Sequence, residues 1–161
     1  MNRIELPNDI LLGEVTEMLR EGHQVVIMTK GNSMNPFING EKDSVNLVRR
    51  DSISPGEIVL ASIRPGVYVL HRVVSVSDGT VVLHGDGNLT GNEKCRVEDV
   101  SGTAFQILKP SGRVVDCLSE KSIGRAAFWN SLPFQVRRYF LAFYRRSGLA
   151  GPKHNRRNEN H

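Results

Sequence analysis

The amino-acid sequence predicts a mainly β domain, with a short helix before it and an amphipathic, basic helix after it. Short β-rich runs recur at regular spacing between residues 24 and 117, and turn signals separate them. From Leu132 onward the apolar residues take helical spacing instead. With 161 residues, of which 39% are apolar, the chain has the size and composition of one folded domain. We expect coiled or barrel-like sheets.

The first element is a helix that Asn8 or Asp9 can cap and that Gly22 ends. The strands after it are separated by turn signals such as Asp78-Gly79, which is the strongest kind of two-residue hairpin signal. The predicted strands cover residues 24–29, 44–48, 57–63, 66–76, 80–84, 100–108 and 113–117.

The C-terminal helix is amphipathic and basic, and we place it at residues 128–148. Arg138 and Arg145 lie on its polar face, opposite an apolar face made of Val136, Phe140, Phe143 and Tyr144. The chain then divides into a β domain with its N-terminal helix (1–127), this helix (128–148) and a polar tail (149–161) that we expect to be disordered.

The net charge of +4 is unevenly distributed along the chain. Residues 137–161 hold seven basic residues and one acid, a net charge of +6, which leaves 14 basic and 16 acidic groups, a net charge of −2, in residues 1–136. A nucleic-acid-binding domain would carry a basic stripe on its folded body, so we expect no nucleic-acid partner. The C-terminal helix suits weak association with an anionic membrane, and it equally suits docking on its own domain.

Cysteine usage and hydropathy exclude several classes of protein. Cys95 and Cys117 are the only cysteines, with no Cys-x-x-Cys and no histidine at metal spacing, so we expect free thiols, no metal site and no cofactor. No apolar stretch approaches the ~18 residues of a membrane span, and residues 1–12 lack the pattern of a secretory signal. We expect a cytoplasmic protein, either free or peripheral on the membrane.

A serine motif occupies residues 31–36, with the sequence Gly-Asn-Ser-Met-Asn-Pro, directly after a predicted strand. A nucleophilic serine needs such a turn, because its hydroxyl must project from the strand end while nearby backbone N–H groups face the developing oxyanion. Small residues of this kind also favour ordinary turns. The motif therefore indicates a nucleophile only in combination with a suitable base and carboxylate elsewhere in the sequence. Ser33 is the candidate nucleophile.

A histidine and a carboxylate accompany the serine. Counting outward from a hairpin at Asp78-Gly79 places His71 opposite Asp86, on one face of two antiparallel strands. Directly opposed Cβ atoms lie about 4.5–5.5 Å apart, close enough for the carboxylate to accept a hydrogen bond from the imidazole and to orient it. A β-bulge in either strand would break this register.

Four segments in this order resemble the successive conserved boxes of type I signal peptidases: 31–36 (Gly-Asn-Ser-Met-Asn-Pro), 56–60 (Gly-Glu-Ile-Val-Leu), 70–74 (Leu-His-Arg-Val-Val) and 85–88 (Gly-Asp-Gly-Asn). The His-Arg pair is similar to that of the archaeal and endoplasmic-reticulum branch, in which histidine replaces the general-base lysine of most bacterial signal peptidases and of LexA-type self-cleaving repressors. The similarity covers residues 24–102, about half of the chain.

The resemblance implies a serine peptidase with a coiled, mostly β catalytic fold. Ser33 would be the nucleophile and His71 its general base. The partner would be a peptide or protein substrate bound as an extended strand, beside the strand that enters Ser33 and the strand that carries His71. Such enzymes accept small residues before the cut.

The sequence departs from this family in its third catalytic residue. The histidine branch has a second aspartate about six residues beyond the Gly-Asp box, where this chain has Asn92 followed by Glu93. The third member is therefore open between Asp86, Glu93 and none. His84, two residues before Asp86, is an alternative base.

The oxyanion hole and the membrane anchor also differ. Gly31 stands where many bacterial signal peptidases have a hydroxyl residue, so we expect oxyanion and substrate binding from Gly31, Asn32 and Met34, chiefly through backbone N–H groups. We also expect no N-terminal membrane anchor, because residues 1–12 show no apolar stretch of the required length.

The alternative function is a LexA-like module that cleaves itself or has lost activity and serves in regulation or binding. About thirty residues with one helix precede the serine motif, too few for a helix-turn-helix DNA reader. Ala150-Gly151 is the obvious small-residue site for self-cleavage.

Overall fold

The computed structural model describes residues 8–148, and they form the mainly β architecture that the sequence predicts. In chain order the elements are α1 (Asn8–Arg20), β1 (Val25–Met28), β2 (Ser44–Val48), β3 (Ile58–Arg64), β4 (Val67–Ser77), β5 (Thr80–His84), β6 (Glu93–Arg96), the 3₁₀ turn η1 (Val97–Asp99), β7 (Val100–Leu108), β8 (Val114–Asp116), α2 (Glu120–Ser131) and α3 (Phe134–Arg146).

All seven predicted strands are present, and the structure adds β6 and α2. The sequence of β6, Glu-Lys-Cys-Arg, has no apolar alternation beyond Cys95, so only its pairing with β5 defines it as a strand. Helix α2 buries only Ala126 and Trp129 and therefore has a weak helical pattern. The predicted boundary between residues 127 and 128 falls inside α2.

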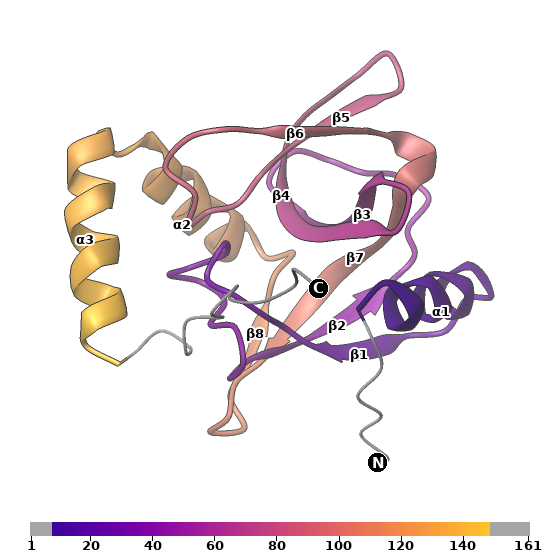
Figure 1. Ribbon diagram of the computed structural model, residues 1–161, viewed down its shortest axis with the longest axis horizontal. Coiled ribbons are helices and arrows are strands. Elements are labelled where there is room, and N and C mark those ends of the chain that lie inside the picture. The colour runs from indigo at the N-terminus through magenta and orange to yellow at the C-terminus, as the bar shows by residue number, and fades with distance from the viewer. Residues whose placement is uncertain (1–7, 149–161) are drawn as a thin grey trace, which may run out of the picture.

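The strands form one antiparallel sheet in the order β1-β2-β7-β3-β4-β5-β6, with β8 paired to β7. Among the described residues β1 and β6 end this path without pairing to each other, so the sheet is open and does not close into a barrel. Figure 1 shows α1 on one side of the sheet and the two C-terminal helices on the other side.

Two apolar clusters hold the sheet together. The larger one joins α1 to β1, β2, β3 and β7 through residues such as Val15, Leu19 and Leu47. Leu19 approaches β7 closely because Gly102 has no side chain: a Cβ there would lie 2.9 Å from Leu19 Cδ1. The second cluster packs Val59, Val73 and Leu83 together, between β3, β4 and β5. The strand that carries His71 is thereby packed on both neighbouring strands.

Helices α2 and α3 dock on the body through Trp129 and Leu141, which are 6% and 2% exposed. The Trp129 ring meets Phe140 edge-on at 5.2 Å. The sequence predicts Tyr144 on the apolar face of the C-terminal helix and Arg145 on the opposite, polar face, and the structure divides these faces differently. Tyr144 and Arg145 both contact the body, whereas Phe143 is exposed.

The tail 149–161, with Ala150-Gly151, lies outside the described residues, as do residues 1–7. None of the helices within residues 8–148 has the length and hydropathy needed to cross a bilayer.

Both cysteines should be unreactive in the folded protein. They are free and buried, and burial raises the pKa of Cys95 to about 11 and that of Cys117 to about 12, from an ordinary value of 9.0. Because the thiolate is the reactive form, we expect no reaction with a thiol reagent at pH 8, and two equivalents of reaction after unfolding in guanidinium. Rapid labelling of the native protein would contradict this burial.

The same pKa values predict that alkali destabilises the fold. A thiol with a raised folded-state pKa favours folding below pH 9, and this contribution is lost as the pH rises towards 11 and 12.

Candidate active site

The serine turn follows β1 and is held from several sides. Gly31 adopts a φ of +71°, which a side chain would disfavour. Met34 is buried at 4% exposure beneath the turn, and Ser33 is half-buried above it. Lys109, at the end of β7, donates to the carbonyl oxygen of Phe37 at 3.0 Å and to Asp43 at 2.7 Å, which ties the loop beyond the serine to the sheet. The serine side chain is thus presented by a fixed turn.

Glycines bring a second turn, residues 85–88, against the serine. The Gly87 N–H donates to the Ser33 carbonyl oxygen at 2.8 Å. A Cβ at Gly85 would lie 2.5 Å from that same oxygen, so the two backbones can approach only because residue 85 is glycine. This turn begins directly after His84, which pairs with Arg72 in β4. The contact brings Ser33 to the part of the sheet that contains His71.

His71 is paired with Glu93. Its Nδ1 lies 3.0 Å from Glu93 Oε2, and its side chain is 6% exposed while that of Glu93 is 29% exposed. A carboxylate can only accept, so the Nδ1 carries the proton and Nε2 of a neutral ring keeps its lone pair. The imidazole is therefore oriented as a general base would be. Of the two carboxylates left open by the sequence, Glu93 is the one in contact with His71.

The expected pairing of His71 with Asp86 does not form, because β4 contains a bulge. Val73 pairs with Leu83 and Ser75 with Val82, which leaves one extra residue between them. A register shift of one residue reverses which face each side chain occupies. Arg72 is consequently the residue whose side chain meets Asp86.

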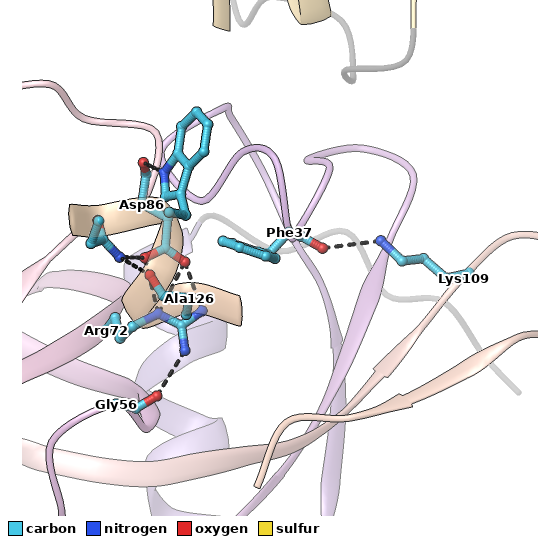
Figure 2. A network of polar contacts seen from close by, with 8 residues as sticks. Phe37, Gly56, Arg72, Asp86, Lys109 and Ala126 are labelled. Atoms are coloured by element: carbon cyan, nitrogen blue, oxygen red, sulfur yellow. Dashed lines mark hydrogen bonds and ion pairs between the residues drawn. The ribbon is translucent and has the colours of Figure 1, made fainter. Parts of the chain in front are cut away.

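Arg72 and Asp86 form a buried, bidentate ion pair (Figure 2). The Nε and Nη2 of Arg72 donate to the carboxylate at 2.9 and 2.7 Å, and Nη1 donates to the Gly56 carbonyl oxygen at 2.7 Å. The guanidinium also lies 5.6 Å from the centre of the Phe37 ring. This pair therefore connects β4, the turn before β3 and the serine loop.

Helix α2 completes the Asp86 environment. Asn130 donates its side-chain N–H to Asp86 Oδ1 at 3.0 Å, and the Trp129 indole N–H donates to the Asp86 carbonyl oxygen at 2.8 Å. The carboxylate is 0% exposed. Within residues 8–148 the Asp86 carboxylate thus accepts from Arg72 and Asn130 and forms no hydrogen bond with His71.

Helix α3 reaches the serine turn through Arg145. Its Nη2 donates to the Gly87 carbonyl oxygen at 3.1 Å and to that of Asn32 at 3.4 Å, so one guanidinium joins the two turns. Desolvation by burial lowers the pKa of Arg145 from its ordinary value and raises that of Tyr144. The helical spacing predicts Arg145 on the polar face, opposite Val136, Phe140 and Phe143. Its contacts depend on the docking of α3, which no local pattern encodes.

Several buried polar atoms around the serine turn have no hydrogen-bond partner among the described residues. Among the described residues the buried, unpaired side-chain atoms include Asn32 Oδ1, both polar atoms of Asn35, and Arg145 Nε. Within residues 8–148 no acceptor takes the backbone N–H groups of Ser33 and Met34. Unpaired buried polar atoms are scarce in folded proteins, and their concentration around one serine is typical of a functional site.

The Ser33 hydroxyl forms no hydrogen bond with His71 in the described part of the chain. Such bonds are often long in a free enzyme and shorten when substrate binds. His84, the alternative base, has its Nδ1 3.0 Å from the Gly91 carbonyl oxygen and 2.9 Å from Asn92 Oδ1. No carboxylate of the described residues forms a hydrogen bond with that ring, which favours His71 as the base.

The concave regions of the described residues include two of similar volume. One, of about 510 Å³, is polar and lies between α1 and residues 97–103. The other, of about 480 Å³, is lined by Arg72, His84, Asp86 and Asn130 among others. Neither of these two regions is lined by Ser33 or His71.

No protein-family model, curated protein or solved structure matches this chain. Its function must therefore be inferred from the contacts around Ser33 and His71.

Proposed function

We propose that the protein is a signal-peptidase-like serine endopeptidase that cleaves a peptide or leader segment, with Ser33 as nucleophile, His71 as general base and Glu93 as the carboxylate that orients His71. The single observation that carries this proposal is the 3.0 Å bond between His71 Nδ1 and Glu93 Oε2. It directs the basic nitrogen of a buried imidazole away from its carboxylate, while the turn that follows His84, the partner of Arg72 in β4, donates a hydrogen bond to Ser33.

The chemistry follows from these roles. As Ser33 Oγ attacks the scissile carbonyl carbon, His71 Nε2 takes the hydroxyl proton, and Glu93 stabilises the imidazolium that forms. The imidazolium then protonates the leaving amine, and the C–N bond breaks to leave an ester on Ser33. A water molecule, deprotonated by His71, hydrolyses that ester and restores the serine.

The backbone N–H groups of the serine turn form the oxyanion hole in this proposal. The N–H groups of Ser33 and Met34 have no acceptor within residues 8–148, and Gly31 and Asn32 shape the same turn. Donors that are already placed stabilise the developing charge without reorganising. Gly31 has no side-chain hydroxyl to donate to the oxyanion, so backbone N–H groups supply the hydrogen bonds.

An extended peptide is the substrate that fits this surface. The serine turn follows strand β1 and His71 lies within strand β4, and an extended chain can bind a sheet protein through its main-chain groups. The finer fold assignment, a coiled sheet of the signal-peptidase and LexA type, is part of this proposal.

A Glu93→Gln variant tests the orienting role. A neutral amide no longer stabilises the imidazolium and can hold the ring in the wrong tautomer, so labelling of Ser33 by a fluorophosphonate should slow by about 10²–10⁴-fold with the fold intact. Mass spectrometry of the labelled peptide identifies the serine. Glu98→Gln is the matched control, because that carboxylate is exposed and its ion pair within residues 8–148 is with Arg96. Equal labelling rates in both variants would remove Glu93 from the mechanism, and labelling at another serine would refute the proposed nucleophile.

A further inference from the structure

Helix α3 lies at the edge of the molecule (Figure 1) and contacts the body through one side. Leu141 is buried on that side, the Tyr144 hydroxyl donates to Asn39 Oδ1 at 2.6 Å, and Arg145 donates to the Gly87 carbonyl oxygen. These residues are three and four positions apart, so they share one face of the helix. The opposite face is turned away from the body.

That opposite face, which we call the aromatic face of α3, is made of large apolar side chains. Their exposed fractions are 49% for Val136, 73% for Tyr139, 45% for Phe140 and 70% for Phe143. The spacing of three, four and seven residues aligns them in one stripe. Phe140 is partly covered by Trp129 and Tyr144, and the other three extend outward. Contiguous exposed apolar side chains mark an interaction surface.

The charge of the helix indicates what this surface binds. α3 contains four arginines and no acid. Arg138 and Arg146 are exposed, whereas Arg137 and Arg145 are partly buried. The chain from residue 137 to its end carries a net charge of +6. An exposed aromatic stripe on a helix without acidic residues is complementary to a bilayer with anionic headgroups.

We propose that the aromatic face of α3 docks on an anionic lipid bilayer, with Tyr139 and Phe143 entering the headgroup region. A second copy of the chain fits less well. Pairing two aromatic faces would bring together Arg146 of both copies, which lies seven residues from Tyr139, with no acid on either α3 to offset the two charges. The bilayer supplies both the apolar layer and the negative charge.

Docking of this face on a bilayer is separate from the proposed peptidase function and does not depend on it. If the peptidase proposal also holds, docking has a consequence for it. The helix that meets the bilayer also holds the serine turn through Arg145, so membrane binding would place Ser33 near the surface at which membrane-associated peptides are found.

Vesicle flotation tests the surface. The full chain carrying Ser33→Ala is used throughout, so that the result is independent of peptidase activity. It should float with phosphatidylcholine vesicles that contain phosphatidylglycerol, and at least about tenfold less with phosphatidylcholine alone. Binding should weaken between about 0.1 M and about 1 M salt, where the Debye length falls from about 10 Å to about 3 Å.

Two pairs of substitutions locate the contact. Tyr139→Ser with Phe143→Ser should weaken binding at least about tenfold, because both side chains would leave the apolar boundary. Arg138→Gln with Arg146→Gln should weaken it about fivefold for each arginine. These side chains are exposed, so the fold should survive, and circular dichroism checks that it does.

The matched controls remove the same kinds of side chain, apolar or basic, from exposed positions outside α3. Val74→Ser with Val114→Ser removes two apolar side chains that are 50% and 52% exposed on strands, and Arg64→Gln with Arg113→Gln removes two exposed charges from the body. Both controls should bind vesicles more tightly than the α3 variants.

Several outcomes would overturn the proposal. One is no binding to anionic vesicles at low salt, and another is equal binding by the Tyr139/Phe143 double variant. A lipid-free dimer that depends on these two residues in sedimentation would assign the face to a second copy. Binding of an oligonucleotide that requires the same residues, without vesicle binding, would assign it to nucleic acid.

Discussion

A Ser33→Ala variant should lose all peptide-bond cleavage while keeping its fold. The substitution removes one hydroxyl from a half-buried side chain that makes no side-chain hydrogen bond within residues 8–148, so it leaves no cavity and no unpaired partner. Without a nucleophile there is no acyl intermediate. Cleavage of a library of peptides with small residues before the cut, followed by mass spectrometry, measures the loss.

His71→Gln provides the companion measurement. It should lower kcat/KM by about 10²–10⁴-fold, which is the range of general acid–base catalysis, whereas His84→Gln should cleave at close to the wild-type rate. The reverse order of effects would transfer the base role to His84. Proteolysis that persists in folded Ser33→Ala protein would end the peptidase proposal. Loss of mass from the chain itself, with no cleavage of added peptides, would favour the self-cleaving alternative.

An Asp86→Asn variant should be strongly destabilised. It removes the charge that balances Arg72 in a pair whose side chains are 10% and 0% exposed, and an uncompensated buried charge costs about 3–5 kcal/mol. For a chain of this size that corresponds to a fall of about 6–20 °C in Tm. Calorimetry or thermal circular dichroism measures the shift.

The controls for Asp86 separate structure from catalysis. Asp51→Asn makes the same chemical change on an exposed side chain, and we expect no measurable change in Tm. Replacing both partners, as Arg72→Met with Asp86→Leu, should recover much of the lost stability because no buried charge is left unpaired. A stable Asp86→Asn protein without activity would instead restore Asp86 to the catalytic set.

Strand positions could be predicted from sequence because their signals are local. The hairpin at Asp78-Gly79 is one example: the predicted pairing of Ser77 with Thr80 and of Val76 with Val81 is present in the structure. The serine turn is another, since Gly31 takes the left-handed conformation that only glycine adopts freely. Alternation and turn chemistry depend on neighbours in the chain, and these are visible in the sequence.

The partner of His71 could not be predicted, because a single residue of register decides it. The extra residue at Val74 pairs Arg72 with His84, on the face that Asp86 shares, so that the side chain of Arg72, and not that of His71, meets Asp86. Nothing in the run of valines and serines around residue 74 distinguishes a bulge from a regular strand. The sequence therefore left the third catalytic member open between Asp86, Glu93 and none.

The sequence by itself determined the mainly β fold, the serine turn and the candidate histidine, because these depend on residues a few positions apart. Only the tertiary structure decided that Glu93, 22 residues from His71, is in contact with it, and that Arg145, 58 residues from Gly87, joins the serine turn to α3. Contacts over such separations arise from how the strands and helices pack, and this packing is a property of the whole chain.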